Sequence, residues 1–191
     1  EAARSSSCQV CGTPSERERL ADYDDLLAWC ARARILSDEQ AAVLQRQAST
    51  DRRAADAALE RARRLRDALH GIFVEIAHGR PVPGGELAIV NGALADAARH
   101  GGIAERDGTF LWQWRRDSID CMLWPIAHSA AELLTGDRLV RIGECGGVAC
   151  GWLFLDETRN RSRRWCEMEV CGNRAKARRH YRRSHAIAAE G

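Results

Sequence analysis

The sequence predicts a mostly helical α+β protein in two parts: a helical N-terminal domain with a small β hairpin over residues 1–137, and a small cysteine-rich domain over residues 138–191. Three observations predict this division. Apolar residues recur at helical spacing through most of the first part. One short stretch within it alternates with the period of a strand. The second part combines four cysteines with a strongly basic run.

Two capping boxes predict the first helices. Ser15 with Glu18 precedes one run of apolar residues, and Ser37 with Gln40 precedes another. In a capping box the serine oxygen accepts a bond from the third helical N–H, and Glu or Gln reaches back to the serine N–H. We therefore expect helices that begin close to these serines.

Three further helices follow. A long helix is expected from about Arg52 to Ile76, between the polar break at 49–51 and the Gly- and Pro-rich stretch 79–85. A second is expected over about 86–100. A third should run from about Ser118 to Leu134, after which the boundary between the domains is expected at 135–137.

The stretch before the last of these helices has a period of two. Phe110, Trp112 and Trp114 alternate with other residues, and Asp107-Gly108 is a favoured hairpin turn. We expect a short hairpin that lays this aromatic face on the helices. Trp112 and Trp114 then either pack as core residues or form the wall of a small-molecule pocket.

Four cysteines dominate the second part. Cys145 and Cys150 form one pair and Cys166 and Cys171 another, with four residues inside each pair and fifteen between them. Zn²⁺ prefers four tetrahedral ligands such as thiolates, and a structural site closes all four positions with protein. The spacing predicts one structural Zn²⁺ at these cysteines, in preference to buried or disulfide-bonded thiols.

The residues around the cysteines predict a knuckle, a hairpin and a helix, the order of a treble-clef finger. Gly146 and Gly147 suit a knuckle, since glycine reaches positive φ cheaply. The apolar run 152–156 has strand character, and 164–166 leads back toward the metal as its expected hairpin partner. A basic helix is expected after residues 171–174.

This segment resembles the CGNR-type zinc finger. The resemblance is carried by Gly151–Asp156, Arg159-Asn160, Arg164–Cys166 and, above all, Cys171-Gly172-Asn173-Arg174. In that family the finger follows an N-terminal domain called ABATE, and the whole is regarded as a bacterial stress-induced transcription regulator. Leu20–Trp29 and Ala130–Leu134 are similar to the ABATE pattern, so the resemblance spans most of the chain.

The resemblance carries two further expectations. Relatives typically open with an apolar segment that ends in a Leu-Asp-Phe-x-Asn-Thr-like string, whereas this chain begins at Glu1 without it. We therefore expect that an N-terminal packing element is missing here. Asn173 and Arg174, two of the residues that name the finger, either organise its turn or contact DNA directly.

Charge separates the two parts. Residues 1–137 hold 17 basic against 21 acidic residues, a balance of −4, whereas residues 138–185 hold 12 against 5, a balance of +7. Arginine offers a planar fork of donors that suits phosphate oxygens and guanine edges, so the basic part predicts binding to double-stranded DNA. The expected contacts are Arg161, Arg163, Arg164, Arg174, Lys176, Arg178, Arg179, Arg182 and Arg183.

These features together predict a zinc-dependent DNA-binding transcription regulator whose N-terminal domain senses a small ligand. A homodimer is expected, because one finger reads few base pairs. The alternatives are a zinc-stabilised RNA-binding module and a protein-interaction module. No enzyme is expected, because the chain has no Gly-rich phosphate loop, nucleophile elbow or zincin motif.

The remaining observations concern compartment and the other cysteines. No apolar window is long enough to span a membrane and no signal peptide is visible, which predicts a cytoplasmic protein that binds no membrane. Cys8 and Cys11 form a second C-x-x-C, for which loop thiols, an oxidisable pair and a metal site all stay open. His180 and His185 are weaker candidates as zinc ligands, and the histidines in helical stretches are expected at the surface or core edge: His70, His78, His100 and His128.

Overall fold

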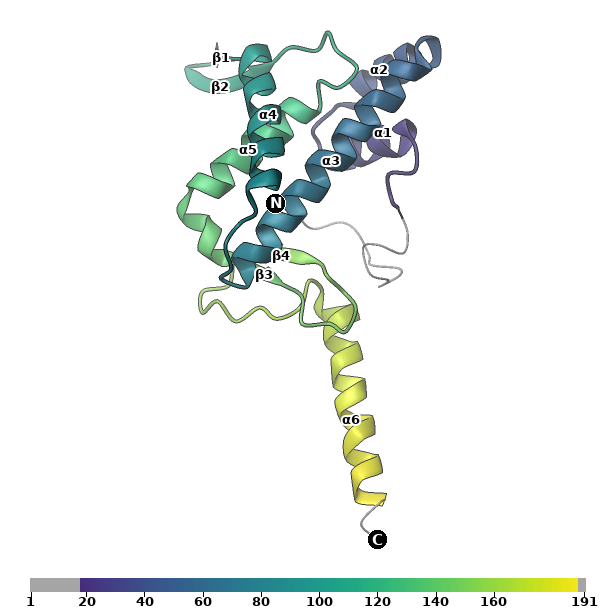
Figure 1. Ribbon diagram of the computed structural model, residues 1–191, viewed down its shortest axis with the longest axis vertical. Helices are drawn as coiled ribbons and strands as arrows, with labels where there is room; N and C mark the ends of the chain where they lie inside the picture. Colours follow the sequence, from purple (N-terminus) through teal and green to yellow (C-terminus); the bar gives the residue numbers. More distant parts are fainter. Residues whose placement is uncertain (1–17, 189–191) are drawn as a thin grey trace.

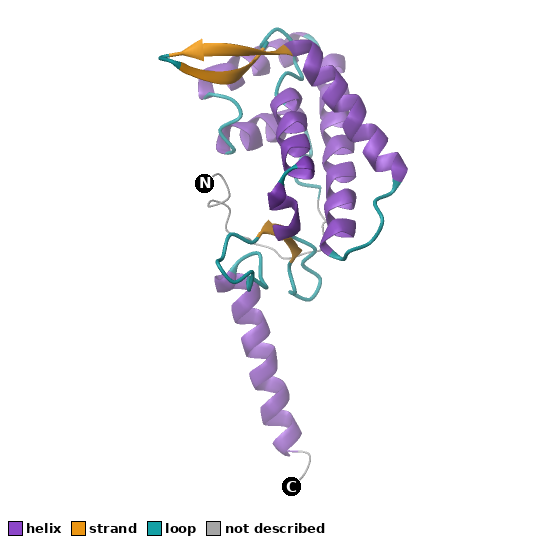
Figure 2. Ribbon diagram, turned by 90° about the vertical axis from the view of Figure 1, so that its left-hand side faces the viewer, coloured by secondary structure: helices purple, strands orange, loops and turns teal. Residues whose placement is uncertain are grey.

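The computed structural model describes residues 18–188 and confirms a mostly helical α+β fold. The elements are α1 (Tyr23–Arg32), α2 (Asp38–Thr50), α3 (Arg52–Ala77), α4 (Gly84–His100), β1 (Gly101–Arg106), β2 (Thr109–Trp114), α5 (Leu123–Thr135), the 3₁₀ turn η1 (Asp137–Arg141), β3 (Ile142–Glu144), β4 (Leu153–Leu155), the π-helical turn η2 (Met168–Gly172) and α6 (Asn173–Ala188). Figures 1 and 2 show α6 projecting from the other elements. Within the described residues, none of the helices has both the length and the apolar character required to cross a bilayer.

The capping box at the start of α2 is confirmed. Ser37 Oγ accepts a hydrogen bond from the Gln40 N–H, and Gln40 Oε1 accepts one from the Ser37 N–H. The long helix α3 also begins where it was expected, with the Asp51 carboxylate accepting the Ala54 N–H. It ends just before Gly79, whose φ of 66° is a conformation that favours glycine.

The first helix begins later than its expected capping box. Asp22 caps α1, because its carboxylate accepts the Asp25 N–H at 2.8 Å. Ser15 lies outside the described residues. Glu18, the expected partner of Ser15, instead forms an ion pair with Arg66 of α3. The expectation for this helix was therefore wrong about its start, because residues 18–22 are not helical and Asp22 supplies the cap.

The last helix of the N-terminal part also begins later than expected. Residues 118–122 form turns in which the Cys121 N–H bonds Ser118 O and the Leu123 N–H bonds Asp120 O. Pro125 is the third residue of α5. Its missing N–H is tolerated there, because the first turn of a helix leaves its N–H groups without intrahelical partners.

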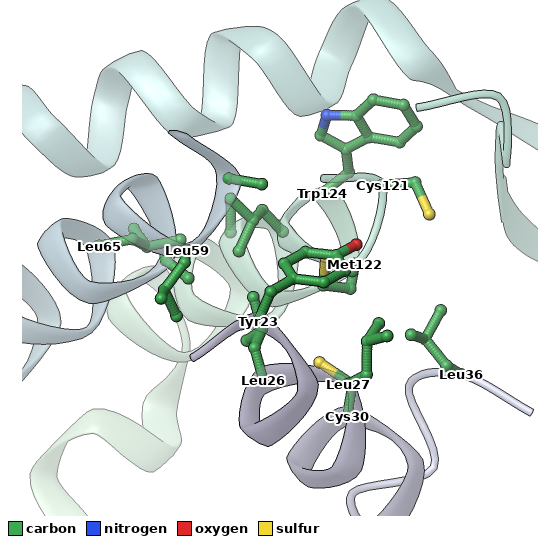
Figure 3. Close-up of a cluster of buried hydrophobic side chains, with 14 of the residues drawn as sticks. Tyr23, Leu26, Leu27, Cys30, Leu36, Leu59, Leu65, Cys121, Met122 and Trp124 are labelled. Atoms are coloured by element: carbon green, nitrogen blue, oxygen red, sulfur yellow. The ribbon is translucent and has the colours of Figure 1, made fainter. Parts of the chain in front are cut away.

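The hydrophobic core surrounds α3. Leu59, Leu65 and Ile72 of α3 are buried, and they meet side chains from α1, α2, α4 and α5. Figure 3 shows Tyr23 and Met122 within this cluster, beside Leu59 and Leu65. Burying one such side chain stabilises the fold by roughly 1.5–3 kcal/mol, so the cluster holds α3 firmly at the centre of the N-terminal part.

The β1–β2 hairpin forms as expected, with antiparallel register from Gly101↔Trp114 to Arg106↔Thr109. Asp107 and Gly108 both have positive φ, which the favoured two-residue turn requires. The aromatic face of the hairpin contacts the helices only at the base of the hairpin, away from the turn. Phe110 is 74% exposed, because the tip of the hairpin extends beyond the helices (Figure 2).

Candidate zinc centre and basic helix

The first cysteine pair lies in the loop of a second hairpin. β3 precedes Cys145 and β4 follows Cys150, and the two strands pair antiparallel from Ile142↔Leu155 to Glu144↔Leu153. The expected hairpin between residues 152–156 and 164–166 was therefore wrong in its partner. Residues 164–166 return without strand pairing, although the Gly146 N–H does bond Arg164 O at 2.9 Å.

A buried carboxylate explains why the chain after β4 forms a loop. Asp156 is only 6% exposed, and its oxygens accept the Thr158 N–H, the Thr158 hydroxyl and the Arg163 N–H. The Thr158 hydroxyl is the main reason that the pKa of Asp156 is lowered. These bonds hold residues 157–163 in a closed loop, which uses backbone groups that a strand would need.

Arg163 has a structural role in this loop that its place in a basic run does not reveal. Its guanidinium donates to the carbonyl oxygens of Leu155, Trp165 and Cys166, and it lies over the Phe154 ring at 4.7 Å. Arg163 therefore joins β4 to the second cysteine pair. Its contact with DNA stays a prediction.

The four sulfur atoms have the arrangement of a tetrahedral metal site. Cys150 Sγ lies 3.6 Å from the sulfurs of Cys166 and Cys171, those two are 3.7 Å apart, and all four lie within 4.8 Å of one another. A Zn²⁺ with Zn–S bonds of about 2.3 Å needs sulfur separations of about 3.8 Å. These separations far exceed a disulfide bond of about 2 Å. The residues thus fit one structural Zn²⁺.

The protonation of the thiols depends on the metal. Burial and the neighbouring thiols raise the pKa of Cys166 to about 12. Burial also opposes ionisation of Cys145, but hydrogen bonds from the backbone of Cys166 and Gly147 outweigh it and lower that pKa. Zinc binds thiolates, so a bound dication is what stabilises four ionised sulfurs in this space.

The two glycines of the first knuckle are needed for close packing. Positive φ occurs at Ala149 and Gly151, not at Gly146 or Gly147, so the conformational reason expected from the sequence was wrong. A Cβ at Gly147 would lie 3.2 Å from Cys171 Sγ, and one at Gly146 would lie 3.3 Å from the Trp165 ring. Glycine lets the backbone approach the sulfurs at Gly147 and the Trp165 ring at Gly146.

The finger has almost no apolar core apart from the sulfurs. Its buried cluster consists of Cys145, Cys150 and Cys171, with Trp165 and Cys166 packed against them. So small a cluster cannot offset the conformational entropy of ordering the segment. Metal binding therefore supplies the free energy that folds this part.

The long helix α3 and its C-cap residue contact both sides of the first knuckle. His70 Nε2 lies 3.1 Å from Gly151 O, directly after Cys150, and His78 Nε2 lies 3.3 Å from a carboxylate oxygen of Glu144, directly before Cys145. Sequence reasoning missed this contact, since both histidines sit on an ordinary helical pattern far from the cysteines in the chain.

The basic residues of α6 are accessible. Arg174, Lys176, Arg178, Arg179 and Arg182 are exposed, and within the described residues none makes an ion pair or a side-chain hydrogen bond. Asn173, the first residue of α6, is exposed too. The side chain of Arg183 lies outside what the structure describes.

Two other predicted contacts lie on the loop. Arg161 is exposed, and Arg164 lies over the Trp165 ring at 5.8 Å. His180 is exposed on α6 and outside the sulfur cluster, while the side chain of His185 lies outside the described residues. The roles in DNA binding of all nine predicted residues stay predictions.

The remaining candidates lie in the N-terminal part. The Trp112 and Trp114 rings stack at 5.6 Å and both meet the His128 ring of α5, which favours a packing role. A pocket at these rings stays a prediction. Cys8 and Cys11 lie outside the described residues.

The fold and the site define a zinc-finger protein whose finger is carried on a helical domain. Residues 6–137 match the family model of ABATE, described as "Putative stress-induced transcription regulator", and the chain belongs to this family. Residues 141–184 match the CGNR zinc finger. Both matches confirm the resemblance inferred from the sequence. A search of curated proteins found no match.

Proposed function

We propose that this protein is a zinc-dependent, DNA-binding transcription regulator that acts in the bacterial cytoplasm in response to stress. The observation that carries the proposal is the set of five exposed cations on α6, for which the described residues offer no counter-charge. The family description supports a regulatory role. The proposed role is not catalytic.

Electrostatics supports a polyanion as the partner. Cations three or four residues apart on a helix repel one another by about 0.2–0.5 kcal/mol per pair, as Arg174 and Arg178 do, or Arg178 and Arg182. Phosphates that approach the helix remove this repulsion and release counterions. Double-stranded DNA offers such charges at regular spacing, and arginine can also reach its guanine edges.

The surroundings of α6 favour duplex DNA over single-stranded RNA. Single-strand readers stack bases on several exposed aromatic rings. Here Trp165 packs against the cysteines, and in the described part of the finger the exposed rings are Tyr181 at 63% and His180 on α6, and Trp152 at 39%, over which the guanidinium of Arg19 lies. These rings are fewer than the five exposed cations of α6, which suit a regular phosphate backbone.

Zinc has an organising role in this proposal. Cys145, Cys150, Cys166 and Cys171 would hold the ion, which supplies the charge that keeps four thiolates together. η2 contains Cys171 and continues directly into α6. The cysteine cluster therefore sets the direction in which the basic helix leaves the finger.

The N-terminal domain is proposed as the sensor of a small molecule, and a homodimer is proposed as the active form. Trp112 is 48% exposed beside His128, so its fluorescence would report a ligand at the hairpin. Screening small molecules for quenching of tryptophan fluorescence that is absent in Trp112→Phe tests the proposed sensor role.

The proposal is tested by binding of the zinc-loaded protein to duplex DNA, single-stranded RNA and heparin over a salt series. The test variant is Arg178→Ala/Arg179→Ala on α6. Its matched control is Arg52→Ala/Arg53→Ala at the start of α3, which removes the same charge from exposed positions. We expect duplex binding that falls steeply with salt, exceeds RNA binding and weakens in the α6 variant alone.

Other outcomes would contradict the proposal. No duplex binding at low salt would favour a protein-interaction module whose basic helix meets an acidic partner. Tighter binding to RNA than to duplex DNA would favour an RNA-binding module. Equal loss of affinity in both variants would mean that net charge, rather than α6, determines binding.

A further inference from the structure

The cations of α6 are arranged as a wide arc around the helix. At about 100° per residue, counted from Arg174, Arg178 lies at about 40°, Arg182 at about 80°, Arg179 at about 140° and Lys176 at about 200°. The remaining sector, from about 240° to 340°, carries His180, Ser184, Ala177 and Tyr181. Cations therefore occupy slightly more than half of the circumference. Within this arc, no gap between neighbouring cations is as wide as the uncharged sector.

The width of this arc indicates the shape of the partner. A helix that rests on a flat surface uses a stripe of roughly 100°. A helix that lies in a groove is contacted on the floor and on two opposite walls, which together cover about half its circumference or more. The arc on α6 has the second width, so a concave anionic surface fits it better than a flat one.

The dimensions agree with the major groove of B-form DNA. An α-helix with its side chains is about 10–12 Å wide, and this groove is about 12 Å wide and 8.5 Å deep. The major groove of an A-form RNA duplex is too narrow and deep for side chains to read. The groove of DNA is therefore the duplex surface that accepts α6.

The tertiary structure leaves this arc accessible. Figures 1 and 2 show α6 leaving the body at its first turn, and its main contact is with η2 at that end. The positions from Arg174 to Arg182 are exposed except for Ala175, which is partly buried. The zinc cluster anchors one end of a helix that is otherwise open to a partner.

We propose that α6 lies in the major groove of B-form DNA, with Arg174 and Lys176 on opposite walls and Arg179 and Arg182 toward the floor. This inference rests on the proposed DNA-binding function. In this arrangement Arg174 and Lys176 contact phosphates, and Arg179 and Arg182 are placed to read base edges.

The test compares single variants at the two edges of the arc. Arg174→Ala and Lys176→Ala are each measured on a DNA duplex of about two helical turns, ~20 bp, and on the same sequence as duplex RNA. Each variant should lower the slope of log affinity against log salt by about 1, because each removes one phosphate contact. Ala177→Gln and His180→Gln, on the uncharged sector, should leave both affinity and slope unchanged.

The groove itself is tested by methylation interference with the wild-type protein on a duplex selected from a random library. Methylation of guanine N7 in the major groove should block binding, whereas methylation of adenine N3 in the minor groove should not. A change of slope in only one edge variant, equal affinity for duplex RNA, or interference at adenine N3 would each overturn the groove assignment while DNA binding stands. A complete lack of duplex binding would overturn the proposed function together with it.

Discussion

The Nε2 atom of His70 lies 3.1 Å from the carbonyl oxygen of Gly151, across 81 positions of sequence. A carbonyl oxygen only accepts, so Nε2 carries the proton in this bond. His70 belongs to α3, the axis of the N-terminal core, and Gly151 directly follows Cys150 of the zinc centre. The bond therefore connects the core of the helical domain to the first knuckle of the finger.

Removal of this bond should weaken zinc binding. His70→Ala leaves the Gly151 carbonyl without its partner, which costs about 1 kcal/mol, or about a fivefold rise in the zinc dissociation constant. Competition with a coloured chelator measures it. His70→Gln places an amide N–H near the position of Nε2 and should restore much of the affinity; equal zinc affinity for wild type and His70→Ala would show that the contact is incidental.

Removal of zinc should unfold the finger and leave the helical domain folded. The finger depends on its sulfur cluster, whereas α1 to α5 share an apolar core of their own. Chelation is expected to cause a partial loss of helical circular dichroism and to expose Trp165 to quenchers. Cys171→Ser should give the same state without a chelator. A spectrum that does not respond to chelation would contradict this prediction.

A methyl group at Gly147 should disturb the zinc centre. Its Cβ would lie 3.2 Å from both Cys171 Sγ and Cys150 Cβ, so the knuckle must shift. Overpacking of this kind costs about 1–3 kcal/mol, so we expect Gly147→Ala to raise the zinc dissociation constant about tenfold or more. The control is Gly102→Ala in β1, where no atom lies within 4 Å of the added Cβ.

Loss of Arg163 should destabilise the finger itself, even in the absence of DNA. Its guanidinium donates hydrogen bonds to three carbonyl oxygens. Alanine can make none of these bonds, and lysine can make only some of them. We expect Arg163→Ala to lower stability by about 1–2 kcal/mol and Arg163→Lys by less. Zinc retention in increasing urea measures this effect. Arg161→Ala, on an exposed neighbour, should match wild type; if it is equally destabilised, loop charge rather than these bonds is responsible.

The pairing of Glu18 with Arg66 predicts a specific dependence on pH. The hydrogen bond from Arg66 lowers the pKa of Glu18 from 4.5 to about 2. Since the folded pKa is below the unfolded value, the stabilisation is complete above pH 4.5 and is lost as the pH falls toward 2. The difference in urea midpoint between wild type and Glu18→Gln should therefore be present at pH 6 and shrink on acidification. A difference that does not change with pH would rule out the ion pair as its source.

Local chemistry made part of this protein predictable. The capping box of Ser37 and Gln40 involves residues three apart, and Asp107-Gly108 forms its turn with its own backbone conformation. Each cysteine pair closes over four residues. In these cases the interacting groups are neighbours in the chain, so their spacing carries the information.

The rest was decided by contacts between distant residues. The sequence by itself determined the helical class, the first hairpin and the four-sulfur site. Only the tertiary structure decided that Glu18 pairs with Arg66 instead of capping a helix, that β4 pairs with β3, and that His70 meets the knuckle. The physical reason is that such polar groups have several partners of similar strength, and the packing of the core around α3 determines which partner comes within hydrogen-bonding distance.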